Sequence, residues 1–270
     1  MAISNETARK LYKRAAGNYA QKLKLETKNI KPVRKVFNKV LSDFQKSYAA
    51  YGHPPHLEHH RALLEKGLKD IHQSTAKKFS GQIREVLGKP HNAARVSQRL
   101  DAHIKGFAAQ RSHLMAHQIT DTTRKNMDTA IKRAKEEAEK EEASLSNKSI
   151  ASRAKDILKE RFDARSIMIS ITETQAAAES GKSLEYETLS ETNAEFDGVN
   201  INEMKAQKMW VTILDDHTRE WHAEVDGDVV DAEEPFEVNG EEMMFPGDDS
   251  LGASEDNLVN CRCCHETFFE

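Results

Sequence analysis

The chain has 270 residues, of which 31% are charged and only 6% are aromatic, and its mean hydropathy is -0.72. Such a balance favours extended helices with thin cores over one thick globular core, and no stretch approaches the roughly 18 consecutive apolar residues of a membrane span. The net charge of -4 hides a strong polarity, because residues 1–100 hold 21 Lys and Arg against 7 Asp and Glu, whereas residues 151–270 hold 10 against 29.

Residues 1–148 are predicted to form a basic helical region. Apolar side chains recur at helical spacing from Val33 to Tyr48, and we expect this helix to begin at Pro32, since proline is tolerated in a first turn. Further amphipathic stretches run over 64–86 and 96–114. The stretch 121–142 is nearly all polar, so we expect this helix to be either a solvent-bridging rod or packed on a partner chain.

Residues 149–200 are predicted to be helices that lead into the last region. Ser149 and Asp163 are suitable caps for two successive helices, and Gly181 is expected to end the second one. The polar segment 179–198 is predicted to be a loose helix or a linker.

Residues 201–270 are predicted to be an acidic α+β module, which makes the whole chain α+β. A strand is expected over 208–214, followed by a short helical turn that Gly227 closes. Short strands are expected at 229–230, 236–238 and 243–245, with a hairpin turn at Asn239-Gly240, and 247–257 reads as an irregular loop.

The densest group of chemically active side chains lies in this module. Its members are Asp216, Arg219, His222, Gly227, Asn260, Cys261, Arg262 and Cys263. In one interpretation the polar members form a structural network that orders the loops, with Asp216 capping the helical turn and binding Arg219. In a second, His222, Cys261 and Cys263 bind a metal such as zinc, with Cys264 or His265 as a further candidate ligand, because Cys-x-Cys places both thiols on one side of an extended segment. In a third, His222 is the base of a hydrolase and Asp216 orients it.

The three cysteines lie within four residues, which argues against a disulfide framework and for synthesis in a reducing compartment. The start of the chain lacks the apolar core of a secretory signal, so we expect none. The basic N-terminal part is a candidate for sequence-independent binding of double-stranded DNA. The candidate DNA-binding side chains are Arg9, Lys10, Lys13, Arg14, Lys22, Lys24, Lys35 and Lys39.

A longer pattern in the module resembles a known family. It runs from Trp210 through Asp215-Asp216-His217-Thr218-Arg219, His222 and Asp226-Gly227, then Phe236, Pro246-Gly247-Asp248 and Gly252-Ala253, to Asn260-Cys261-Arg262-Cys263. This pattern, with the upstream Thr172-Glu173-Thr174, resembles the MuF-type phage head-morphogenesis domain, and the resemblance covers about 150–265.

The resemblance implies a structural minor head protein of a tailed phage. Such proteins lie inside the capsid at the portal vertex, act in head morphogenesis and in some cases in DNA packaging or delivery. The implied partners are the portal protein, packaged DNA and other copies of the chain. Some relatives carry a fused toxin or enzyme domain after this one; only seven residues follow Cys263, so we expect none here and expect no enzyme. The alternative function is a metal-dependent nuclease or other hydrolase that uses the His, Cys and Asp cluster.

Overall fold

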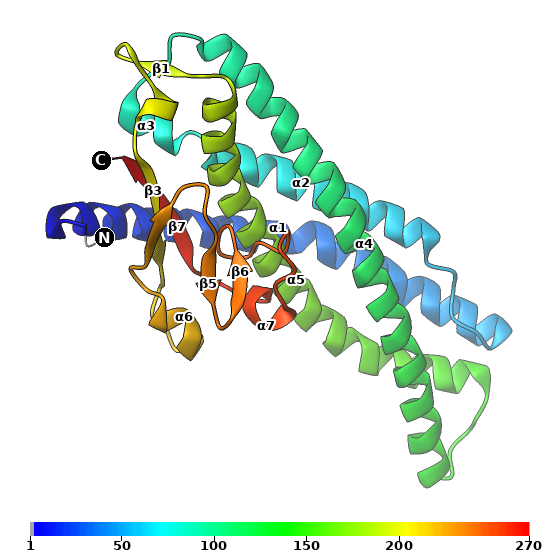
Figure 1. Cartoon of the computed structure of the whole chain (residues 1–270). Coiled ribbons are helices and arrows are strands. Elements are labelled where there is room, and N and C mark those ends of the chain that lie inside the picture. The colour runs from blue at the N-terminus through cyan, green and yellow to red at the C-terminus, as the bar shows by residue number, and fades with distance from the viewer. Residues whose placement is uncertain (1–2, 270) are drawn as a thin grey trace. The chain divides into compact units, whose positions relative to one another are not determined.

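The computed structural model describes residues 3–269 and confirms the predicted α+β class (Figure 1). Five helices come first: α1 (Asn5–Tyr51), α2 (Glu58–Phe79), α3 (Gln82–Leu87), α4 (Ala93–Lys140) and α5 (Asn147–Glu191). Short antiparallel strands follow. None of the helices in the described part of the chain is both long and apolar enough to cross a bilayer.

The chain forms two compact units, and neither is continuous in sequence. One, here called the mixed unit, comprises the described residues of Met1–Glu26, Ile71–Ala108 and Ile171–Glu270. The other, the helical unit, comprises Thr27–Asp70 and Ala109–Ser170. These units differ from the predicted regions 1–148, 149–200 and 201–270. The physical reason is helix length: α1, α4 and α5 have 47, 48 and 45 residues, so each is about 70 Å long and contributes to both units.

Two predictions based on local patterns concern the helical unit. Pro32 lies inside α1 rather than at its start, because the buried apolar stripe from Val33 to Tyr48 continues a helix that already began at Asn5. The polar stretch 121–142 belongs to α4, and its narrow apolar face is already covered by the chain itself. The covered side chains are Met127, Ala130, Ala134 and Ala138.

Helix α5 is continuous through Gly181, where we expected it to end. A Cβ at Gly181 would lie 2.4 Å from the carbonyl oxygen of Ala76, so glycine is needed there for backbone packing against α2 rather than for termination. The following residues are helical up to Glu191 and many are buried, so 179–198 is not a linker.

The mixed unit contains a three-stranded antiparallel sheet in the order β4-β3-β7, made of β3 (Ala206–Val211), β4 (Val229–Asp231) and β7 (Cys264–Phe269). Two hairpins, β1 (Glu195–Phe196) with β2 (Val199–Asn200) and β5 (Phe236–Val238) with β6 (Glu241–Met243), and the short helices η1 (Ile201–Glu203), α6 (Glu220–Glu224) and α7 (Glu255–Leu258) complete it. The predicted turn at Asn239-Gly240 joins β5 and β6, with positive φ at both residues. The strand expected at 243–245 is β6, which lies at 241–243.

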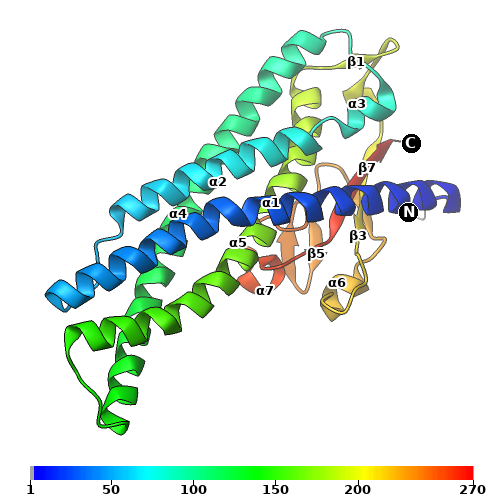
Figure 2. The same cartoon turned by 180° about the vertical axis from the view of Figure 1, so that it is seen from behind.

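Strand β3 is buried on both faces. On one face Met209 and Val211 pack against Leu11 of α1, which crosses β3 and β7 in the view of Figure 2. On the other face Trp210 packs in a second core with Phe236, Val238, Met243, Cys261 and Cys263. The sheet therefore separates two cores. Successive side chains of an extended segment point to opposite faces, so Cys261 and Cys263 lie in the core around Trp210, and Cys264 lies in the other core.

Candidate functional site

The structure brings His222, Cys261 and Cys263 together in the core around Trp210. The Sγ atoms of Cys261 and Cys263 lie 3.7 and 3.5 Å from His222 Nδ1, and all three side chains are buried. His222 comes from α6, whereas the cysteines precede β7. Cys264, one residue further, lies on the other side of the sheet, 3.3 Å from Lys22 Nζ. The predicted Cys-x-Cys pair therefore faces one side, as its spacing requires.

The ring of His222 is held by Asn257 of α7, which sequence reasoning did not identify. Asn257 Nδ2 donates to Glu241 Oε2 at 2.7 Å and to the Val238 carbonyl at 3.3 Å, so its Oδ1 faces the other way. That oxygen lies 3.1 Å from His222 Nε2 and accepts the indole hydrogen bond of Trp221 at 2.7 Å. Because Oδ1 can only accept, Nε2 carries the ring proton and the lone pair of Nδ1 points at the two thiols.

The two cysteines are electrostatically different. The hydrogen bond from Cys263 lowers the pKa of Cys261 well below its ordinary value, with a further contribution from His222. The same bond, together with burial, raises the pKa of Cys263. Cys261 is thus the sulfur that loses its proton first.

The loop between β3 and α6 lies beside the cluster of His222, Cys261 and Cys263. The contacts that this loop makes differ from those that we expected. Asp216 was expected to bind Arg219, but the ion pair in this loop joins Asp215 to Arg262, with 2.8 Å between Oδ2 and Nη1. Arg219 donates to the Val259 carbonyl at 2.5 Å. Asp216 is exposed and makes no hydrogen bond to Arg219 or His222 among the described residues.

The same geometry contradicts one element of the hydrolase interpretation. In that interpretation Asp216 orients the ring of His222 as a general base. In this structure an amide orients His222, and its second nitrogen faces two thiols. The predicted pairing of Asp216 with His222 was therefore wrong, because the turn before α6 points Asp216 to solvent.

Two other members of the predicted network have backbone roles. Gly227 has φ +87°, and a Cβ there would lie 3.3 Å from the hydroxyl of Tyr12, which donates to Asp226 at 3.0 Å. Asn260 also has a positive φ, 57°, and its N–H donates to the hydroxyl of Thr172 at 3.2 Å. Both residues fix the path of the loops relative to α1 and α5 within the mixed unit.

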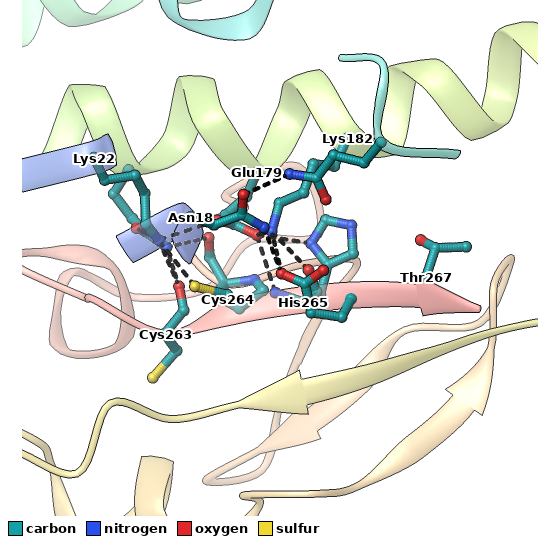
Figure 3. A network of polar contacts seen from close by, with 12 residues as sticks. Asn18, Lys22, Glu179, Lys182, Cys263, Cys264, His265 and Thr267 are labelled. Atoms are coloured by element: carbon teal, nitrogen blue, oxygen red, sulfur yellow. Dashed lines mark hydrogen bonds and ion pairs between the residues drawn. The ribbon is translucent and has the colours of Figure 1, made fainter. Parts of the chain in front are cut away.

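On the opposite side of the sheet lies a buried charged network that the sequence did not reveal (Figure 3). Lys22 Nζ contacts Gln175 at 2.5 Å, Glu179 at 3.1 Å and the Cys263 carbonyl at 3.1 Å. Lys182 binds Glu179 at 2.7 Å and the His265 carbonyl at 2.6 Å. Glu266 accepts from Asn18 at 2.7 Å and from Arg14. The only sequence signal was the spacing of Gln175, Glu179 and Lys182, which puts three polar side chains on one face of an alanine-rich helix.

The pKa values in this network keep its charges balanced. Burial by itself lowers the pKa of Lys22, but its close contacts with Cys264 and Glu179 together outweigh burial and raise it. Burial raises the pKa of Glu179, yet Lys182 and Lys22 lower it overall. Burial raises the pKa of Cys264 to about 11 and lowers that of His265 to about 4, so both are neutral at pH 7. Two ammonium groups thus face the carboxylates of Glu179 and Glu266.

This network corrects two of the candidate DNA-binding residues. Lys22 is fully buried, and Arg14 donates to Glu266 and to the Thr267 carbonyl, so neither side chain is available to a phosphate. The other six candidates are exposed on α1: Arg9, Lys10, Lys13, Lys24, Lys35 and Lys39. Because α1 runs along a sheet, some of its basic side chains point toward that sheet. The helical periodicity of the sequence did not identify which basic side chains these are.

The comparisons with known proteins give little coverage. No family model matches the chain, and no solved structure matches it. Over 66 residues, 24% of the chain, it is 42% identical to NAD(+)--arginine ADP-ribosyltransferase EFV from Enterococcus faecalis. The chain spans only 12% of that relative's length.

This match contradicts the prediction that the chain is not an enzyme, because the relative is named as one and the identity is high over the matched residues. The prediction rested on the resemblance to head proteins, which does not test whether the chain has a catalytic activity.

Proposed function

We propose that the chain is a minor head protein of the MuF type, which acts at the portal vertex of a tailed phage in head morphogenesis. One observation supports this best: residues that carry the resemblance, although spread over more than fifty positions, gather in one place. Trp210, His222, Cys261 and Cys263 share a core, and Asp215, Arg219 and Arg262 order the loop beside it. The pattern thus corresponds to one folded module rather than to scattered coincidences.

The test of this proposal is co-purification with the portal protein of the phage that encodes the chain. Both proteins are expressed together with an affinity tag on the portal protein. The proposal predicts that the chain elutes with the portal oligomer, and that mass spectrometry finds it in purified virions. A chain that is absent from virions and separates from the portal oligomer would contradict it.

We further propose that the exposed basic side chains of α1 bind packaged double-stranded DNA without sequence preference. Support comes from the exposure of Lys24, Lys35 and Lys39 in a helix that carries few acidic side chains. Binding through phosphates releases counterions, so the affinity should fall steeply with salt.

The DNA proposal is tested with the full chain and a labelled duplex across a salt series. Changing the three lysines to glutamate should weaken binding and flatten the salt dependence. The matched control places the same charge change on exposed lysines of α4, at Lys125, Lys132 and Lys135. Equal effects of both triple variants would mean that net charge alone, and not this face of α1, governs binding.

A second candidate function is transfer of ADP-ribose from NAD⁺ to arginine, which the match to the Enterococcus faecalis enzyme favours. The matched part is a small share of that relative, so the activity of the whole relative is a hypothesis for this chain. Incubation of the purified chain with labelled NAD⁺ and an arginine-rich acceptor tests it. Transfer of label would support the candidate, and no transfer under conditions in which the relative is active would exclude it.

A further inference from the structure

We propose that His222, Cys261 and Cys263 bind one zinc ion, with a water molecule as the fourth ligand and Asn257 as the residue that positions the histidine. This inference does not depend on the function proposed above. It rests on four independent features of the cluster: its distances, its charge, its orientation and the space beside it.

The distances fit a tetrahedral ion. With Zn–S bonds of about 2.3 Å and Zn–N bonds of about 2.0–2.1 Å, sulfur and nitrogen ligands of one ion lie about 3.6 Å apart. The two Sγ–Nδ1 distances are 3.7 and 3.5 Å, and the three donor atoms all lie within 4.8 Å of one another. Thiolate and imidazole ligands in this geometry favour zinc over harder cations such as magnesium or calcium.

The charge also fits. Burying an isolated dication is costly, but two cysteine thiolates cancel the two positive charges of zinc and leave a neutral site with His222 as a neutral ligand. Without an ion, the two buried thiols would make only weak S–H contacts to the ring of His222. Such weak contacts would not explain why two cysteines face one histidine.

The ring of His222 is held in a fixed orientation. Two cysteines that only filled an apolar core would not require this. Histidine ligands of metal ions donate their other ring N–H to a carbonyl, carboxylate or water, which fixes the tautomer and the ring plane. Asn257 Oδ1 has this role here, and Glu241 fixes the amide of Asn257 in turn. Asn257 has no exposed surface, so this support is built into the core.

The fourth position is provided by a small cavity of about 10 Å³. Its lining includes all three ligands together with Thr218 and Arg219. That volume is about the minimum for one water molecule. Zinc with three protein ligands and a water is a known arrangement, so the cavity completes the coordination without a fourth side chain.

Metal analysis of the full chain, purified without chelator, tests the proposal. We expect one zinc per chain in the wild type. The ligand variants Cys261→Ser, Cys263→Ser and His222→Ala should lose at least nine-tenths of it. Cys264→Ala is the matched control, because it removes the neighbouring buried thiol on the other side of the sheet and should keep the zinc. Wild-type protein without zinc that takes up none from solution, or equal loss in Cys264→Ala, would overturn the proposal.

Cobalt replacement keeps the test decisive if the ligand variants fail to fold. Wild-type protein with Co²⁺ should show thiolate-to-cobalt charge-transfer absorption and the intense visible bands of a tetrahedral site. His222→Cys retains a ligand and should keep a site with stronger thiolate absorption. A cobalt spectrum typical of oxygen ligands, or an intact mass two hydrogens lighter that shows a Cys261–Cys263 disulfide, would contradict the proposed site.

Discussion

Asn257 accepts a hydrogen bond from His222: Oδ1 lies 3.1 Å from Nε2, and the opposite ring nitrogen faces two cysteine thiols. The asparagine is held in this orientation by Glu241 and Val238, so the tautomer of His222 is set by residues more than fifteen positions away from it. Histidines that bind metal ions almost always donate their second ring N–H to an acceptor in this way.

The first prediction concerns this asparagine. Asn257→Leu removes the acceptor for His222 Nε2, so the ring loses its fixed tautomer and zinc affinity should fall about 10–100-fold. Competition with a chromogenic chelator measures this. Cys264→Ala, treated in the same way, should change the affinity by much less, and an unchanged affinity in Asn257→Leu would remove Asn257 from the site.

The second prediction concerns metal removal. A ligand that binds only the folded state stabilises it by about 4 kcal/mol when its free concentration is a thousand times its dissociation constant. Thermal unfolding with and without EDTA should therefore differ for the wild type and hardly at all for His222→Ala. If EDTA left the wild-type melting temperature unchanged, the ion would contribute nothing to stability.

The third prediction concerns Gly181. Gly181→Ala places a Cβ 2.4 Å from the Ala76 carbonyl oxygen, which is backbone and cannot rotate away, so we expect a loss of about 1–3 kcal/mol or more. Gly106→Ala is the control, since that helical glycine has no atom within 4 Å of a built Cβ, and alanine there should stabilise by up to about 1 kcal/mol. Urea unfolding of both variants measures the difference. Equal effects would mean that α5 does not contact α2 at Gly181.

The fourth prediction concerns the buried network. Lys22→Met removes one of two buried ammonium groups and leaves Glu179 short of a partner, for which we expect a loss of about 3–5 kcal/mol. Lys24→Met, two residues along the same helix, alters an exposed side chain and should cost less than about 0.5 kcal/mol. Adding Glu179→Gln to Lys22→Met should recover part of the loss in a double-mutant cycle. No recovery would show that packing, rather than charge balance, accounts for the effect.

The fifth prediction concerns pH. Burial, with the hydrogen bond to Asp226, raises the pKa of Tyr12 from 10.0 to about 12. A group whose pKa is raised by folding stabilises the fold below its unfolded pKa and loses this contribution as pH rises through the folded pKa. Stability should therefore fall between about pH 10 and 12 more steeply in the wild type than in Tyr12→Phe. Parallel curves would mean that the Tyr12–Asp226 contact is absent in solution.

The sequence predicted what depends on short-range pattern and missed what depends on distant packing. The Asn239-Gly240 turn, the helical stripe from Val33 to Tyr48 and the Cys-x-Cys pair follow from local geometry and were found where expected. Gly181 and Pro32 were read as boundaries because both residues disfavour helix interiors. Tertiary contacts outweighed that preference in both cases.

The charged residues were the hardest to assign. A lysine in an amphipathic helix is normally solvated, and nothing near Lys22 in the sequence distinguishes it from Lys24. Its partners Gln175, Glu179 and Cys264 come from α5 and β7, more than 150 residues later. Asn257 was missed for the same reason, because the residue that it supports is far from it in sequence.

The central claim is a zinc ion held by two cysteines and one histidine, and X-ray absorption at the zinc edge tests it most directly. The full chain should give two sulfur neighbours at about 2.3 Å and two lighter neighbours at about 2.0–2.1 Å, one from His222 and one from water. A first shell made only of nitrogen and oxygen atoms would contradict the claim, because it would show zinc bound elsewhere on the chain.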